Sequence, residues 1–171
     1  MKKLTLPLVI LAATFTGSAA HAVPSLMIQA TIVTGQPVFP SPMPSLMVAD
    51  SSVVPIRSTN GPSAALNLTC KFQTFPIFGM FCRRAIIHVD GFSRAPLQVE
   101  AYNVVSRSWA RIGSATLPNN PTRTTFPINF SSPTMAARFI NAAGQMSVRL
   151  RRSDTRQFEI IMDCVGVETL Y

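Results

Sequence analysis

Short segments in which apolar and polar residues alternate recur along the whole chain and are separated by turn residues. A period of two residues is typical of a β-strand with one buried face, because successive side chains of a strand point to opposite sides. The clearest runs are Leu66, Leu68 and Cys70; Met146, Val148 and Leu150; Phe158, Ile160 and Met162; and Leu26, Ile28, Ala30 and Ile32. About eight such strands, with hardly any helix, predict an antiparallel β-sandwich or barrel.

Proline, glycine and asparagine mark the connections between these strands. Residues 37–44 hold four prolines and predict an extended connector, since proline cannot donate to a sheet ladder. Asn60-Gly61-Pro62 and residues 118–121 predict turns. Pro127 predicts that its strand lies at a sheet edge. A helical turn is expected only in residues 135–141.

The first 22 residues have the three-part plan of a secretory signal peptide. Lys2 and Lys3 precede an apolar stretch over residues 4–15, and Ala20-His21-Ala22 forms a small-residue cleavage site. The apolar stretch is shorter than the roughly 20 residues that span a bilayer. We therefore expect cleavage after Ala22 and one domain over residues 23–171, with no transmembrane segment. The expected location is periplasmic or secreted.

The charged residues of the expected mature chain are mostly arginines. Removal of the leader leaves 13 basic and 7 acidic residues, and Lys71 is then the only lysine. Guanidinium groups suit carboxylates and phosphates, so an anionic envelope surface is one candidate partner. Scattered solubilising charges are the simpler interpretation. Export argues against a nucleic-acid partner.

Three cysteines remain after the leader, and export places them where disulfides form. Cys70, Cys82 and Cys164 allow one bridge in three pairings. We favour Cys70–Cys82, because the two residues flank one short apolar segment.

The order of features resembles the galactose-binding-like β-sandwich modules of secreted bacterial proteins. The resemblance is carried by residues 31–35 and 46–52, by residues 97–103 with Ser108-Trp109, and by residues 139–144, 148–150 and 158–165. Near their C-terminus, similar modules show an aromatic residue and isoleucine, a small loop with glycine, Val-Arg-Val, and then Phe-x-Leu-x-Ile-Asp. The resemblance implies a jelly-roll sandwich over nearly all of the mature chain. It also implies sugar binding, lipid-surface binding or a purely structural role.

Aromatic residues supply two candidate binding sites. Trp109 is the only tryptophan; we expect it to pack in the core, with stacking on a sugar ring as the alternative. The segment between Cys70 and Cys82 is unusually apolar. If exposed, it would form a membrane or partner patch together with two adjacent arginines, and otherwise it would cap the core. Its candidate residues are Phe75, Phe78, Phe81, Arg83 and Arg84.

Arg149, Arg151, Arg152 and Arg156 form the one basic cluster. Arg149 and Arg151 share a strand face and could hold an anionic ligand. Pairing with Glu159, Asp163 or Glu100 on neighbouring strands is the interpretation that we favour.

Catalytic and metal sites are not indicated by the residue patterns. His88 is the only histidine beyond the leader, and no Gly-x-Ser-x-Gly elbow accompanies it. Asp50, Asp90, Asp154 and Asp163 are too dispersed to predict a calcium site, and we expect no cofactor.

These observations favour a non-catalytic binding module at a surface, with carbohydrate as the first ligand class and a protein or membrane partner as the second. An assembly protein of the bacterial envelope is the main alternative, since an exposed edge strand could pair with another subunit. A hydrolase would need His88 beside a nucleophile in an open cleft.

Overall fold

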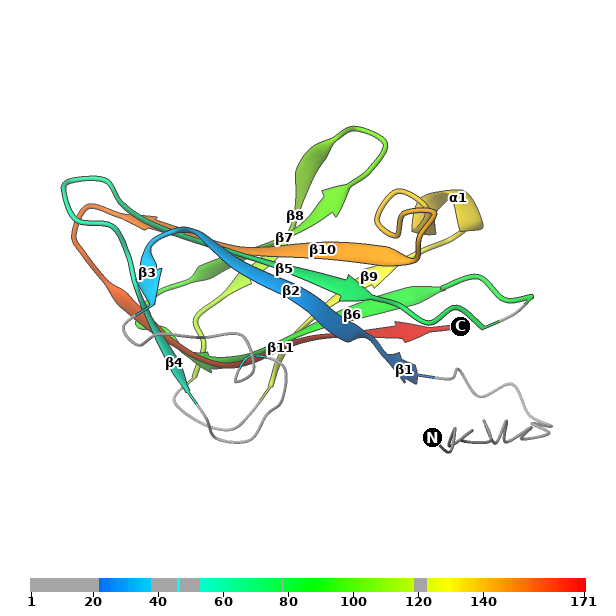
Figure 1. The fold of residues 1–171 in the computed structure, drawn as a ribbon, viewed down its shortest axis with the longest axis horizontal. Helices are drawn as coiled ribbons and strands as arrows, with labels where there is room; N and C mark the ends of the chain where they lie inside the picture. Colours follow the sequence, from blue (N-terminus) through cyan, green and yellow to red (C-terminus); the bar gives the residue numbers. More distant parts are fainter. Residues whose placement is uncertain (1–21, 38–45, 47–52, 78, 119–122) are drawn as a thin grey trace, which may run out of the picture.

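The computed structural model describes residues 22–37, 46, 53–77, 79–118 and 123–171. Within these residues the chain forms two antiparallel sheets that pack face to face (Figure 1). The five-stranded sheet has the order β2 (Leu26–Thr34), β5 (Ala64–Gln73), β10 (Gln145–Asp154), β7 (Leu97–Asn103) and β8 (Ser108–Ala115). The six-stranded sheet has the order β3 (Gln36–Pro37), β4 (Val54–Arg57), β11 (Glu159–Leu170), β6 (Arg84–Phe92) and β9 (Thr124–Asn129), with β1 (Ala22–Pro24) also paired to β11.

The connections give the sandwich its jelly-roll topology. From β4 onward the chain passes to the opposite sheet at almost every step, and only β7 and β8 follow one another within a sheet as a hairpin. This confirms the all-β jelly-roll sandwich expected from the alternating segments. The edge position expected from Pro127 is also confirmed, because β9 is the last strand of its sheet.

The core lies between the sheets and is built from the alternation seen in the sequence. Along β5 every second residue is buried, from Ala64 to Phe72. Met146, Val148 and Leu150 of β10 and Ile160 and Met162 of β11 are also fully buried. Each strand therefore places one face in the core and leaves the other for solvent or a ligand.

Strand β2 departs from the expected alternation. A register shift between Met27 and Gln29 places Met27 in the core and leaves Leu26 and Ile28 exposed. We expected Leu26 and Ile28 on the buried face, and that expectation was wrong. A β-bulge inserts one residue, which moves the side chains beyond it to the other side of the sheet.

The remaining elements lie at the ends of the sandwich. The expected helical turn is α1 (Pro133–Ala136), which begins and ends earlier in the chain than predicted and is capped by the Ser132 side chain at Met135 N–H. Figure 1 shows α1 and the C-terminus at the same end of the molecule, while the turns after β4 and β10 form the other end. The predicted leader and most of the proline-rich connector lie outside the described residues. Val23 and Pro24, which follow the expected cleavage site, pair with Thr169 and Glu168 of β11.

Candidate functional site

The outer face of the five-stranded sheet is covered by polar side chains. Because the alternate residues of these strands fill the core, the residues between them point outward. We call this surface the polar face. Its residues are Gln29 and Thr31 on β2, Asn67, Thr69 and Lys71 on β5, Ser147, Arg149 and Arg151 on β10, Gln98 and Glu100 on β7, and Arg111 and Ser114 on β8.

Two aromatic rings stand at the β8 edge of the polar face. Trp109 and Tyr102 are directly opposite in the β7–β8 hairpin, and their ring centroids are 5.3 Å apart in an edge-to-face arrangement. Such a pair is favourable because the positive edge of one ring meets the negative face of the other. Trp109 is half-buried and does not belong to the core. We call these two rings the aromatic edge.

Arg149 connects the aromatic edge to the centre of the polar face. Its guanidinium carbon lies 4.4 Å from the centroid of the Trp109 ring, and its Nε donates to Oε2 of Glu100 at 2.5 Å. The Arg149 and Glu100 side chains are only 17% and 10% exposed. A short, poorly hydrated ion pair is stronger than one at an open surface, so the three side chains form a fixed unit.

The structure corrects one expectation for this site and agrees with another. We expected Trp109 in the core, which was wrong, because the register of the hairpin places it on the outer face with Tyr102. The expected pairing of Arg149 with a neighbouring carboxylate is present, with Glu100 as its partner. Arg151 shares this face, opposite Gln98 and Asn67, and is exposed.

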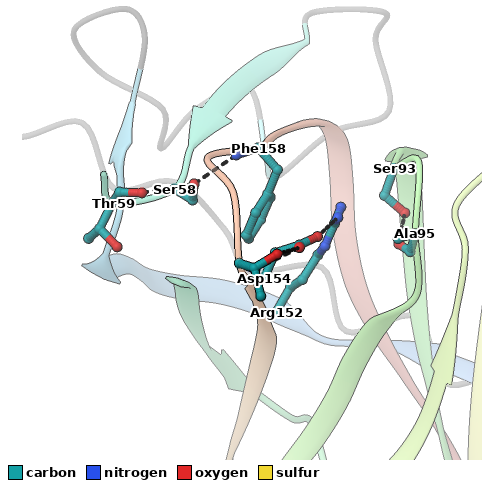
Figure 2. Close-up of polar contacts among 8 residues, drawn as sticks. Ser58, Thr59, Ser93, Ala95, Arg152, Asp154 and Phe158 are labelled. Carbon is teal, nitrogen blue, oxygen red and sulfur yellow. Dashed lines mark hydrogen bonds and ion pairs between the residues drawn. The ribbon is translucent and has the colours of Figure 1, made fainter. Parts of the chain in front are cut away.

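Arg152, which the sequence grouped with the surface arginines, is a buried side chain. It lies on the core side of β10, where Nη2 donates to Oδ2 of Asp154 at 2.6 Å. The guanidinium carbon is 4.1 Å from the ring centroid of Phe158, and Figure 2 shows Arg152 and Asp154 beside that ring. The hydrogen bond from Arg152 holds the pKa of Asp154 below its usual value. This arginine therefore stabilises one end of the sandwich and is not part of the polar face.

The apolar segment after β5 belongs to a different surface from the aromatic edge. Phe75 and Met80 are exposed, and Phe81 is half-buried with the Arg83 guanidinium carbon 5.8 Å from its ring centroid. Arg84 begins β6 and is exposed. Phe78 lies outside the described residues. The structure thus divides the predicted binding residues into the polar face and this segment.

The expected Cys70–Cys82 disulfide is absent from the structure. Cys70 is fully buried between the sheets, whereas Cys82 precedes β6 and its Sγ donates to the Arg84 carbonyl oxygen at 3.2 Å. Both are buried free thiols. Burial raises the pKa of Cys70 to about 12 and also raises the pKa of Cys82.

A second group of titratable residues lies on the six-stranded sheet. His88 Nε2 is 3.3 Å from Glu168 Oε2, and the histidine side chain is 13% exposed. Asp90 accepts from Arg123 Nε at 3.1 Å. Burial raises the pKa of Asp90, and Asp163 adds to that effect, while Arg123 and His88 oppose it. Within the described part of the chain, no group of three His, Cys, Asp or Glu residues could hold a metal ion.

In the part of the chain that the structure describes, no helix has the length and apolar character needed to cross a bilayer.

Comparison with solved structures places carbohydrate-binding modules among the similar folds. A mutant of a family 29 carbohydrate binding module aligns with a TM-score of 0.49 and 6% identity, covering 88% of this chain and 92% of the module. A second family 29 mutant, complexed with mannohexaose, has a TM-score of 0.48, 6% identity and the same coverage. TmCBM61, in complex with beta-1,4-galactotriose, has a TM-score of 0.39 and 9% identity, covering 90% of this chain and 88% of that one.

Sequence comparison identifies no relative. No family model matches the chain, and no curated protein sequence matches it. At sequence identities this low, the ligands bound by the similar structures say nothing about the ligand of this chain.

Proposed function

We propose that this protein is an exported, non-catalytic module that binds carbohydrate on the polar face of its five-stranded sheet. The observation that carries the proposal is the half-buried pair of Trp109 and Tyr102 at the edge of that face, with Arg149 and Glu100 fixed beside it. A sugar has an apolar face of C–H groups and a rim of hydroxyls. A ligand of this kind requires an aromatic surface next to hydrogen-bonding side chains.

The aromatic edge supplies the surface for stacking. Arg149 covers one side of the indole, and we assign the stacking of a sugar ring to the opposite side. The negative electrostatic potential above an indole attracts the weakly positive C–H groups of a sugar. Tyr102 packs edge-to-face with the indole, so that the surface is ordered before a ligand arrives. This preorganisation lowers the entropy cost of binding.

The centre of the polar face supplies the hydrogen bonds. Asn67, Thr69, Gln98 and Ser147 carry amide and hydroxyl groups that both donate and accept, as sugar hydroxyls do. The side chains stand on paired strands, and rigid strands hold such groups more firmly than loops do. A row of this kind across several strands suits an extended chain of sugar residues lying over the sheet.

The test is retention of the protein on immobilised polysaccharides of plant, fungal and bacterial origin at low and high salt. We expect retention on at least one neutral glycan that survives high salt, because stacking and neutral hydrogen bonds are not screened by ions. Trp109→Ala is expected to weaken the affinity roughly 30-fold, about 2 kcal/mol, the size typical of an aromatic residue at the centre of a binding site.

Phe75→Ala is the matched control, since it removes another exposed aromatic ring from a different surface. The proposal predicts unchanged glycan affinity for this control. Equal losses for Trp109→Ala and Phe75→Ala, or no retention of the unmodified protein on any glycan, would contradict it.

The edge strand β2 favours a second candidate function, which is assembly by strand pairing. β2 is the last strand of its sheet, and Leu26, Ile28 and Val33 on it are 50%, 41% and 60% exposed. An exposed apolar edge strand is a template for pairing with another chain. Sedimentation velocity across a range of concentrations tests this candidate: assembly would be reversed by Ile28→Lys, and a strictly monomeric protein would exclude it.

A further inference from the structure

The end of the sandwich that carries α1 presents exposed apolar side chains. The segment between β5 and β6 holds Phe75, which is 48% exposed, and Met80, which is 44% exposed. Pro76 beside them is also exposed. Large apolar side chains in one short segment expose more apolar surface than isolated surface residues do, and patches of this kind usually mark interaction sites.

A pocket of about 280 Å³ opens beside this segment. One side is formed by Pro76, Met80 and Phe81 and the other by Ala136, Ala137 and Ile140 from α1 and the residues that follow it. The backbone between the two sides is fixed, because Thr74 N–H and Oγ1 both donate to the Gly144 carbonyl oxygen, at 2.8 and 2.7 Å. The pocket is therefore a stable concave surface with mainly apolar walls.

The charged side chains on the two segments that flank the pocket are all positive. Arg83 and Arg84 follow the apolar segment, Arg138 follows α1, and all three are exposed. No aspartate or glutamate occurs in residues 71–86 or 123–153, which contribute the β5–β6 and β9–β10 connections at this end. The arginines at this end are therefore not neutralised by carboxylates from the same segments. The surface combines an apolar centre with a cationic border, and we call it the basic apolar end.

We propose that the basic apolar end docks onto an anionic lipid bilayer, independently of carbohydrate binding on the polar face. Phe75 and Met80 enter the interfacial layer, and Arg83, Arg84 and Arg138 contact lipid phosphates. Apolar side chains gain free energy on leaving water, and each arginine near an anionic surface adds a further attraction. Arginine also holds phosphate through two parallel hydrogen bonds.

The charge pattern favours a bilayer over a second copy of this chain. Two copies that met symmetrically through this end would place the same arginines against one another. Burying like charges together is unfavourable, whereas an anionic surface neutralises them. The apolar centre in turn favours a lipid surface over a fully hydrated acidic polymer.

The experiment is co-sedimentation with lipid vesicles, using protein expressed from residues 1–171. One set of vesicles is phosphatidylcholine alone, and the other is equal parts of phosphatidylcholine and phosphatidylglycerol. We expect binding to the anionic vesicles that weakens with salt. The double variants F75S/M80S and R83Q/R84Q are each expected to bind the anionic vesicles at least about tenfold more weakly than the unmodified protein.

The control variants are Val33→Ser and Arg156→Gln, which make the same kinds of change at exposed positions on β2 and in the β10–β11 turn. They should bind like the unmodified protein. Glycan retention by F75S/M80S should stay unchanged, so failure of this proposal is distinguished from failure of the carbohydrate proposal. The docking proposal is overturned by equal binding to both vesicle types, by unchanged binding of the two double variants, or by a dimer that F75S/M80S converts to monomer without any vesicle binding.

Discussion

The guanidinium of Arg149 lies against the Trp109 ring, 4.4 Å from its centroid, while its Nε is bonded to Glu100. Three side chains from three neighbouring strands, β10, β7 and β8, are thereby held in one arrangement. The arrangement places an aromatic ring and a charged hydrogen-bonding pair side by side at the edge of the polar face.

Arg149→Met should release this arrangement. Glu100 would be left in a mostly buried position without its cation, and we expect the free energy of unfolding to fall by about 3 kcal/mol. Trp109 is the only tryptophan, so intrinsic tryptophan fluorescence reports on this site alone. Loss of the covering guanidinium should shift its emission to longer wavelength. Arg151→Met, on the same strand face but exposed, should change neither quantity, and a similar shift in both variants would count against the described contact.

Asp90 should make the stability of the protein depend on pH. Its raised pKa means that the folded protein holds this proton more tightly than the unfolded chain, whose pKa is near 3.8. The free energy of unfolding should therefore fall as the pH rises from about 4 through the higher folded pKa. Urea unfolding between about pH 4 and 7 should show a smaller fall for Asp90→Asn. A steeper fall in the variant would show that the pKa is lowered in the folded state.

Asp154 should make the free energy of unfolding depend on pH in the opposite direction to Asp90, so the two residues can be compared. The hydrogen bond from Arg152 lowers its pKa, so its contribution to stability is present above the unfolded pKa and is lost as the pH falls. Asp154→Asn should therefore be less sensitive to acid than the unmodified protein in the same urea series. Greater acid sensitivity of this variant would contradict the described bond.

Cys70 and Cys82 should react with thiol reagents very slowly in the folded protein. Burial raises the pKa of Cys70 to about 12, so almost no thiolate is present at neutral pH and a thiol reagent has little access. After unfolding without a reductant, Cys70 and Cys82 should both react with iodoacetamide, as measured by peptide mass spectrometry. Recovery of a Cys70–Cys82 cross-linked peptide from the unreduced protein would show instead that the bridge predicted from the sequence forms.

Gly91 should tolerate no side chain. It has a φ of +155° and lies opposite Met162, next to a register shift in β11. An added Cβ would meet the carbonyl oxygen of Ile161. Gly91→Ala should lower the free energy of unfolding by about 3 kcal/mol or more, whereas Gly61→Ala, at positive φ with nothing within 4 Å, should lose only about 1 kcal/mol to backbone strain. Similar losses at both positions would contradict the close approach at Gly91.

Much of the sandwich could be predicted because its core strands alternate without interruption. The period of two at Leu66, Leu68 and Cys70 is the same period that the structure buries in β5. Arg152 could have been placed by the same rule, since it extends the series Met146, Val148 and Leu150 by one step onto the core face. A charged residue at that step favours a surface position from sequence alone, because buried arginines are uncommon without a partner.

The candidate site was less predictable because a shift of one residue decides which face a side chain occupies. The bulge in β2 exposes Leu26 and Ile28, and no local residue pattern predicts this bulge. Trp109 and Arg111 are two residues apart and therefore share one face of β8. An aromatic residue near a turn could still lie on the core face or on the outer face, and only the pairing with Tyr102 decides between them. The contact of Arg149 with Trp109 joins positions 40 residues apart in the sequence and depends on the order of β10, β7 and β8 in the sheet.

The most direct test of carbohydrate binding on the polar face is a titration of Trp109 fluorescence with an oligosaccharide of the glycan that retains the protein. A sugar ring stacked on the indole should shift the emission to shorter wavelength, saturably, with little dependence on salt. The affinity from fluorescence should equal that measured independently by calorimetry. Calorimetric binding without any change in the emission of Trp109 would place the ligand elsewhere and contradict the account.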